Sequence, residues 1–322
     1  MADYRILGEG LFLTKAMADK ALLEIYSKHM EEISNIITKY KDVDIDTEVS
    51  TFNGLKRFST KFYGDVAEIY DSVTRIKNIE RNPIGFNFND AAILGLLIRI
   101  WKIFKEVVYY YEKNNGDIIS LLDRQIIESA VIAKYLLVNG DSAIEDYRKC
   151  SYKDRLNILT DSTRSPEFFK TPAGIRLKSS IIEKMKAENL TVGSFDEQKK
   201  NRWKLAGKNF YQIFAEVEPP EFYKYLYGIP SESIHGTWNE SMDFHLRRNE
   251  GGTFGPYPFY QEVDIRFVTP LIRIVNDPYL LWLKRIDAEM EYINKAFAWI
   301  NSINVRLFDS FEKAYALREQ NG

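Results

Sequence analysis

Two short stretches of the chain place residues capable of chemistry one helical turn apart. Arg124 and Glu128 are four residues apart, which puts both side chains on one face of a helix. Ser231 and His235 have the same spacing and would place a hydroxyl beside an imidazole, the side chain that exchanges a proton near neutral pH. The four residues form a candidate catalytic set if the fold brings the two helices together.

Each pair also has a purely structural interpretation. Arg124 and Glu128 can form an ion pair on a partly solvated helix face, which contributes little to stability. His235 has apolar and aromatic neighbours in the sequence, which predicts a side chain at least half buried that hydrogen-bonds to Glu128 or Glu232. The sequence leaves the functional and the structural interpretations open.

The helices that must position these residues are marked by apolar side chains at intervals of three and four. One helix begins at Asp117, which stands where an N-cap is expected, and ends at Asn139-Gly140. The helix before it spans residues 87–113 with Asn89 as the cap, and it is apolar nearly all round. Such a helix is typical of the centre of a bundle, so the two helices together predict the core.

One local basic cluster stands out in a chain whose formal net charge is -2. It falls on a helix predicted over residues 143–159, and its members are Tyr147, Arg148, Lys149, Lys153 and Arg155. The cluster would either bind a phosphate group or form a solvated face, since acidic residues lie among its cations. His245, close to Arg247 and Arg248, is a further candidate for substrate binding.

Three motifs together resemble a known family. They have the forms R-x-x-x-E-x-x-x-x-x-x-Y-L, a Tyr-Arg element continuing into K-D-R-L, and Y-L-x-x-x-x-S-E-x-x-H-G. The matching residues are Arg124, Glu128, Tyr135, Leu136, Tyr147, Arg148, Lys153, Asp154, Arg155, Ser231, Glu232, His235 and Gly236. Over residues 85–245 the chain resembles a bacterial and archaeal family of helical proteins of unknown function, which is mentioned beside the HEPN (higher eukaryotes and prokaryotes nucleotide-binding) superfamily.

The resemblance implies a protein that binds or acts on RNA or a nucleotide, as a metal-independent ribonuclease or as a toxin or effector of a prokaryotic defence system. HEPN ribonucleases carry an arginine, a polar residue and a histidine on one helix, so that the arginine binds phosphate while the histidine handles a proton. No arginine stands four to six residues before any of the three histidines, so this motif is absent. A nuclease site would take its arginine from another helix, as Arg124 or Arg148, with His235 moving the proton and Glu128 orienting the imidazole. The alternative is a non-enzymatic helical interaction module in which the same Arg, Glu and His residues form a buried structural network.

Composition bounds these expectations. The chain has 322 residues, of which 45% are hydrophobic and 14% aromatic, enough to fill the core of one large or two ordinary domains. A single cysteine, Cys150, rules out an intramolecular disulfide framework and fits a reducing cytoplasm. No apolar run reaches the roughly 18 residues of a membrane helix, and no signal peptide is recognisable, so we expect a cytoplasmic protein without a membrane partner. We predict no metal or other cofactor, and as partners RNA or a nucleotide, a second copy of the chain or another protein.

The predicted fold is all-α, because no alternation of apolar and polar residues persists beyond five residues. We expect an elongated helical bundle in which a central four-helix unit is flanked by N- and C-terminal helices. The predicted division is an N-terminal helical hairpin over residues 1–84, a HEPN-like unit over 85–250 and closing helices over 251–322.

Several finer expectations follow from capping and breaking residues. Helices are expected over residues 14–40 and 54–79, and a long helix is expected to begin after Pro278. Residues 161–207 should be loops with two short helices, and residues 251–258 an irregular loop.

Overall fold

The computed structural model describes residues 4–7, 11–14, 29–152, 155–159, 166–195 and 204–321. Helices dominate these residues, and the chain is all-α, as the sequence predicts. Two small antiparallel strand pairs join β1 (Tyr4–Leu7) to β2 (Leu11–Thr14) and β3 (Leu246–Arg248) to β4 (Phe254–Pro256). Within the described part of the chain, no helix is long and apolar enough to cross a membrane.

The chain divides into two compact units, each built from separated segments. Unit 1 comprises residues 1–85, 94–130 and 224–322, and unit 2 comprises residues 86–93 and 131–223. Two long helices, α4 (Phe88–Glu112) and α5 (Gly116–Asn139), supply residues to both. The three-part division expected from the sequence stays a prediction.

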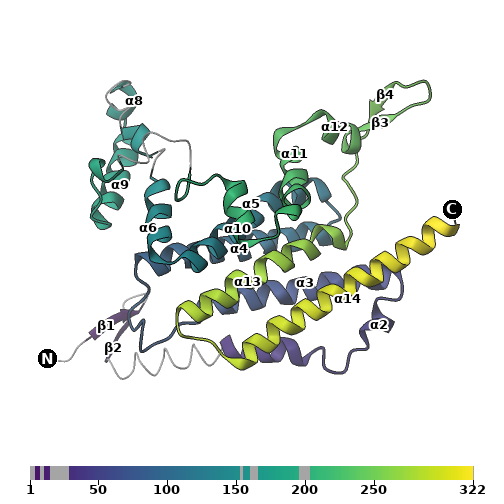
Figure 1. Ribbon diagram of the computed structural model, residues 1–322, viewed down its shortest axis with the longest axis horizontal. Coiled ribbons are helices and arrows are strands. Elements are labelled where there is room, and N and C mark those ends of the chain that lie inside the picture. Colours follow the sequence, from purple (N-terminus) through teal and green to yellow (C-terminus); the bar gives the residue numbers. More distant parts are fainter. Residues whose placement is uncertain are drawn as a thin grey trace. The chain divides into compact units, whose positions relative to one another are not determined.

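Three long helices of unit 1 pack against one another: α3 (Phe52–Arg75), α13 (Thr269–Arg285) and α14 (Glu291–Asn321). They run side by side in Figure 1, with the short α2 (Ile45–Glu48) preceding α3. Residues 29–38 are also helical, whereas residues 15–28 of the helix predicted over 14–40 lie outside the described residues. The helix predicted over residues 54–79 corresponds to α3, which begins and ends a few residues earlier.

A buried aromatic cluster joins α3, α4 and α13. The rings of Tyr70 and Tyr279 are stacked with their centres 4.6 Å apart, and Phe104 meets Tyr70 edge-on. Both hydroxyls have partners: Tyr70 donates to Asn276 Oδ1 at 2.6 Å, and Tyr279 donates to the carbonyl of Leu97 at 2.8 Å. Because buried polar groups are costly unless hydrogen-bonded, these two bonds fix the relative register of the three helices.

A lysine of α3 sits in an unusual environment in the same unit. The Nζ atom of Lys56 donates to the carbonyls of Tyr111 and Val263 and lies 3.4 Å from the centre of the Tyr111 ring. Burial lowers the pKa of Lys56 from its ordinary 10.5 to about 8, and the charge of Asp264 offsets only part of that effect.

This shift makes stability depend on pH in a defined direction. Between pH 8 and 10.5 the unfolded chain keeps a proton on Lys56 that the folded chain has released, so stability rises with pH. We expect the wild type to gain about 1–2 kcal/mol of unfolding free energy relative to Lys56→Met over that interval, after allowance for solvent screening. Urea unfolding from pH 7 to 10.5 measures the difference, and exposed Lys61→Met is the control. If the difference in unfolding free energy between the wild type and Lys56→Met stays constant from pH 7 to 10.5, the prediction is contradicted.

The expected helix start after Pro278 is wrong. Pro278 lies inside α13, which continues to Arg285. The chain breaks instead at Asp287, which has a φ of 53°, with Ala288 N bonded to Leu283 O and Asp287 N bonded to Lys284 O. This paired hydrogen-bond pattern closes a helix with a left-handed residue, most often glycine, which is why the sequence does not reveal it.

Two predicted N-caps are also wrong by two residues. The side chain of Asn115, not that of Asp117, accepts from the backbone at the start of α5, at Ile118 N. Likewise Asn87, not Asn89, caps α4 by accepting from Asp90 N at 2.8 Å. In both cases several capping residue types stand close together, and propensity alone does not choose between them.

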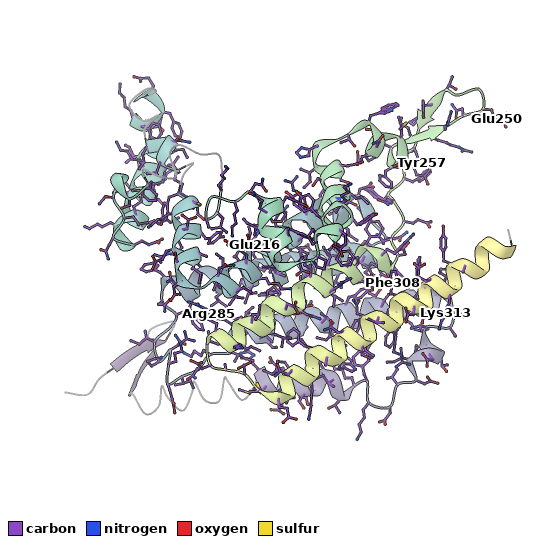
Figure 2. The ribbon with its side chains drawn as sticks, in the orientation of Figure 1. Glu216, Glu250, Tyr257, Arg285, Phe308 and Lys313 are labelled. Atoms are coloured by element: carbon purple, nitrogen blue, oxygen red, sulfur yellow. The ribbon has the colours of Figure 1, made fainter. Side chains whose placement is uncertain are left out.

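The expected irregular loop at residues 251–258 contains β4 and closes a hairpin. Gly251 and Gly252 have φ values of 85° and 80°, which allow the chain to reverse between β3 and β4. Glu250 lies in the connection and Tyr257 follows β4, as Figure 2 shows. The prediction that this segment is not helical is therefore confirmed, but the segment is not irregular, because β4 pairs with β3.

Unit 2 consists mainly of helices that are shorter than α4 and α5. They are α6 (Asp141–Cys150), residues 155–159, α8 (Pro166–Lys170), α9 (Pro172–Ala187), η1 (Val192–Phe195), α10 (Phe210–Val217) and η3 (Pro220–Phe222). A small apolar core within it is formed by Tyr152, Leu156, Ile181, Met185 and Phe195. The described parts of 161–207 thus contain the two expected helices, but α9 is longer than a short helix and contributes to this core.

Candidate functional site

Two segments of unit 1 bring the candidate catalytic residues together. The helix α5 carries Arg124 and Glu128, and the continuous turns η4 (Lys224–Gly228) and α11 (Ile229–His235) carry Ser231 and His235. The turn η4 is π-helical. This conformation is rare in proteins as a whole, but where it occurs it is often at a functional site. Pro230 stands in the first turn of α11, as its sequence position predicts.

Arg124 is the centre of the cluster. Its Nε donates to Glu128 Oε1 at 3.1 Å, and its Nη1 lies 3.3 Å from Nε2 of His235. Its guanidinium carbon lies 4.7 Å from the centre of the Tyr227 ring, close enough for a cation–π contact. The guanidinium thus contacts Glu128 of its own helix and both Tyr227 and His235 of the η4–α11 segment.

Tyr227 and Glu128 complete the support of the arginine. The Tyr227 hydroxyl donates to Glu128 Oε1 at 2.6 Å, the same oxygen that accepts from Arg124. Burial lowers the pKa of Arg124, but the hydrogen bond that Arg124 donates to Glu128 and the charges of Tyr227 and Glu128 outweigh it, so the pKa is raised. Arg124 is therefore a fixed cation.

His235 differs from its expected environment. The sequence predicts an imidazole at least half buried, but His235 is exposed at the last residue of α11. Its sequence neighbours Ile234 and Trp238 are themselves 40% and 59% exposed, so they supply no cover. A pattern of apolar neighbours does not reveal that this segment faces solvent.

The partner of the imidazole also differs. The contact of His235 within the cluster is with Arg124, and Glu128 positions the arginine instead of orienting the imidazole. Because a guanidinium only donates hydrogen bonds, the contact uses the lone pair on Nε2 of His235. Ser231 shares the helix face of His235, but its hydroxyl donates to the carbonyl of Tyr227 at 2.6 Å within its own turn.

Comparison with known proteins adds one finding. Residues 90–253 match a family described as a family of unknown function, DUF5677, and this match covers just over half of the chain. The chain belongs to the DUF5677 family. No curated protein and no solved structure matches it. The resemblance to a helical family of unknown function is thus confirmed at that level.

The DUF5677 region runs from the first turns of α4 to the end of the β3–β4 connection. It therefore contains Arg124, Glu128, Tyr227 and His235, which together form the Arg124 cluster. It also contains His245, which lies at the end of α12 (Trp238–Phe244) with its Nε2 3.0 Å from Glu240 Oε1. Its neighbours Arg247 and Arg248 are exposed on β3.

The basic cluster of the DUF5677 region lies in unit 2 and is partly engaged there. Arg148 forms an ion pair with Glu188 and donates to Asn89 Oδ1 at 2.7 Å. The guanidinium of Arg155 lies 5.6 Å from the centre of the Tyr152 ring, and Lys153 is outside the described residues. Tyr147, Arg148 and Arg155 remain candidates for substrate binding, with Arg148 the least available to a ligand because of its carboxylate partner.

The role of Tyr227 was not expected from the sequence. It donates to Glu128 and lies under Arg124, so it links α5 to η4. The signal was present: Tyr227, Ser231 and His235 are spaced four residues apart and share one helix face. That spacing marks Tyr227 as a candidate for the site, although it does not identify Glu128 as its partner.

Proposed function

We propose that this protein binds RNA and cleaves it without a metal ion, with Arg124 holding a phosphate group and His235 moving a proton. One observation carries the proposal: an exposed imidazole nitrogen lies 3.3 Å from a guanidinium that Glu128 and Tyr227 hold in place. An arginine fixed in this way is organised in advance for an anion. A histidine beside it is organised for acid–base work on the same group.

The arginine retains donors for a ligand. A guanidinium carries five N–H groups, more than the hydrogen bonds to Glu128 and His235 use. A phosphate oxygen seated against Arg124 would accept from these donors. The adjacent hydroxyl of an RNA ribose would then lie within reach of Nε2 of His235.

The cleavage step follows from this arrangement. The phosphate takes the place of His235 on Arg124, which breaks the Arg124–His235 contact and frees the lone pair on Nε2. The O2′ proton then passes to Nε2 of His235 while O2′ forms a bond to phosphorus and the bond from phosphorus to O5′ breaks. The leaving O5′ takes a proton from water, and the imidazolium returns its proton to the hydroxide that remains. The products are a 2′,3′-cyclic phosphate and a 5′-hydroxyl, and DNA cannot react because it lacks the 2′-hydroxyl.

Nearby exposed groups support a single-stranded substrate. Trp238 and Phe254 form an edge-to-face pair with ring centres 5.8 Å apart, and they are 59% and 42% exposed. Exposed aromatic rings stack on unpaired bases, and exposed arginines such as Arg247 and Arg248 attract the backbone. His245 lies between Trp238 and Arg247 in the sequence and belongs to the same proposed binding surface.

The proposal includes a HEPN-like character in which the arginine comes from α5 and the histidine from α11. On the strength of that resemblance, we propose that the protein is a toxin or effector of a prokaryotic defence system, acts in the cytoplasm and works with a second copy or a partner protein. The alternative, a buried structural network in a non-enzymatic module, is less well supported because His235 is exposed and Arg124 and Glu128 are partly exposed.

The test is direct incubation of the purified protein with end-labelled single-stranded RNA in EDTA, with DNA of the same sequence as the control. We expect RNA to be cut and DNA to stay intact, and expression of the protein to arrest bacterial growth. If the wild type neither binds nor cuts RNA and does not arrest growth, the proposal fails and the interaction module takes its place.

A further inference from the structure

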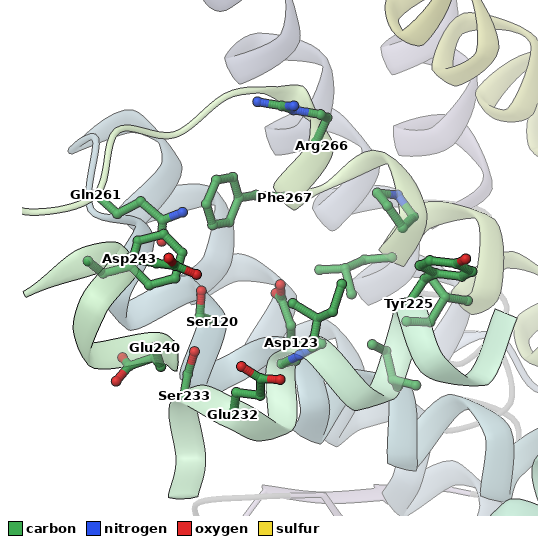
Figure 3. A pocket seen from close by; sticks show the side chains of 17 residues that line it. Ser120, Asp123, Tyr225, Glu232, Ser233, Glu240, Asp243, Gln261, Arg266 and Phe267 are labelled. Atoms are coloured by element: carbon green, nitrogen blue, oxygen red, sulfur yellow. The ribbon is translucent and has the colours of Figure 1, made fainter. Parts of the chain in front are cut away.

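A second site lies on a different face of α5. A cavity of about 430 Å³ within unit 1 is lined by residues of α5, η4, α11, α12, η5 (Ile265–Phe267) and α13. Figure 3 shows its lining side chains, with those of Asp123, Glu232, Glu240 and Asp243 among them. The volume is in the range of pockets that hold small organic molecules.

The charged side chains that line the cavity are mostly acidic. Among the described residues that line the cavity, four carry carboxyl groups and one, Arg266, carries a cation. One of the four, Glu240, also lies 3.0 Å from Nε2 of His245, which is outside the lining. Arg266 is already paired, because its Nη2 lies 2.7 Å from Asp264 Oδ2 and its guanidinium carbon lies 5.0 Å from the centre of the Phe311 ring. The cavity therefore presents negative potential to a ligand, which attracts cations and excludes phosphate.

Asp123 is the residue that points to a ligand. It is 8% exposed, and its Oδ1 is buried without a hydrogen-bond partner among the residues that the structure describes. Burial raises the pKa of the Asp123 carboxyl well above its ordinary value, which favours its neutral form while the cavity is empty. The negative potential of the cavity therefore comes from Glu232, Glu240 and Asp243, and an ammonium group beside Asp123 would favour its ionised form. A buried carboxyl oxygen without a donor is costly, and its presence in the wall of a cavity is explained if a ligand supplies the donor.

The remaining walls define the kind of ligand. Apolar and aromatic side chains, among them Phe244, Phe267 and Leu271, make up much of the lining. Such walls suit methylene groups, whereas a strongly hydrated metal ion gains nothing from them. We propose that this cavity binds a small aliphatic polyamine, with Asp123 accepting from one ammonium group and Glu232, Glu240 and Asp243 neutralising the others.

This site is independent of the proposed RNA cleavage. The variants that test it are at Asp123 and Glu232, whereas the RNA site uses Arg124 and His235. Glu240 is not varied, because it contacts His245 of the proposed RNA-binding surface. A polyamine pocket can exist whether or not the protein is a nuclease. The test therefore measures binding alone, on the intact chain of 322 residues.

The experiment is isothermal titration with spermidine at constant ionic strength, with choline chloride and magnesium chloride titrated in parallel. We expect one spermidine per chain and at least about tenfold weaker binding for Asp123→Asn, in which the amide cannot pair with an ammonium charge. Glu232→Gln should weaken binding by a smaller factor. Asp309→Asn, which removes an exposed carboxylate outside the cavity, is the matched control and should bind as the wild type does.

Three results would overturn the proposal. Equal spermidine binding by the wild type, Asp123→Asn and Asp309→Asn would mean general surface attraction. Magnesium binding at one site per chain without spermidine binding would mean a metal site. No saturable binding by the wild type would mean that no amine is bound. If Asp123→Asn fails to fold, Glu232→Gln against Asp309→Asn decides the same question.

Discussion

Replacing His235 by alanine should lower the rate of RNA cleavage by about 10²–10⁴-fold, the range for loss of an acid–base group. The folded state should be nearly unaffected, because His235 is exposed and its hydrogen bond is to an arginine that Glu128 and Tyr227 still hold. We expect a change in unfolding free energy within about 0.5 kcal/mol. Single-turnover cleavage of a labelled RNA and thermal unfolding of the same preparation measure the two quantities.

His245→Ala is the matched control for this prediction. His245 is also a histidine paired with a partner at hydrogen-bond distance, Glu240, but it lies outside the Arg124 cluster. Its loss should affect RNA affinity modestly and leave the rate of the bound complex near that of the wild type. Equal rate losses in the two variants, or a His235→Ala enzyme that cuts RNA normally, would remove His235 from the reaction.

Replacing Arg124 by alanine should have the second-largest effect. Loss of a fixed donor to a reacting anion costs about 10²–10³-fold in rate. It should also lower the slope of log affinity against log salt concentration by about 0.7, the contribution of one phosphate contact to a single strand. We expect a stability loss of about 1 kcal/mol, because Glu128 loses a partly buried partner.

Arg124→Lys separates charge from geometry. A lysine keeps the positive charge but cannot reach Glu128, His235 and a phosphate together, so rate should fall while most of the salt dependence stays. Arg57→Ala removes an exposed arginine that pairs with Glu48 on the surface, and both rate and salt slope should match the wild type. An Arg124→Ala protein with wild-type affinity and salt slope would show that no phosphate is bound there.

The sequence predicts the fold class and the main helices because these depend on local periodicity. The spacing of Arg124 and Glu128 and that of Ser231 and His235 likewise fixes which side chains share a helix face. Helix ends are less predictable: Pro278 is tolerated inside α13, and Asn115 caps α5 although Asp117 is an equally good capping residue. These choices depend on tertiary contacts, which override propensity.

The candidate site shows the same limit. Periodicity cannot tell that α11 faces solvent, so the sequence predicts a His235 side chain at least half buried although it is exposed. Nor can it find partners far along the chain, such as Glu188 for Arg148 or Tyr227 for Glu128. The cavity beside Asp123 cannot be predicted from the sequence, because it forms only where several segments of unit 1 pack together.

The measurement that tests the central claim most directly is the chemical identity of the RNA ends left by the wild-type protein in EDTA, read by mass spectrometry. A substrate with 2′-deoxyribose at the cleaved position serves as the internal control. If Arg124 holds the phosphate while His235 takes the O2′ proton, every product ends in a 2′,3′-cyclic phosphate and the 2′-deoxy position is not cut. Products with a 3′-hydroxyl and a 5′-phosphate, cleavage at the 2′-deoxy position, or no cleavage at all would contradict that claim.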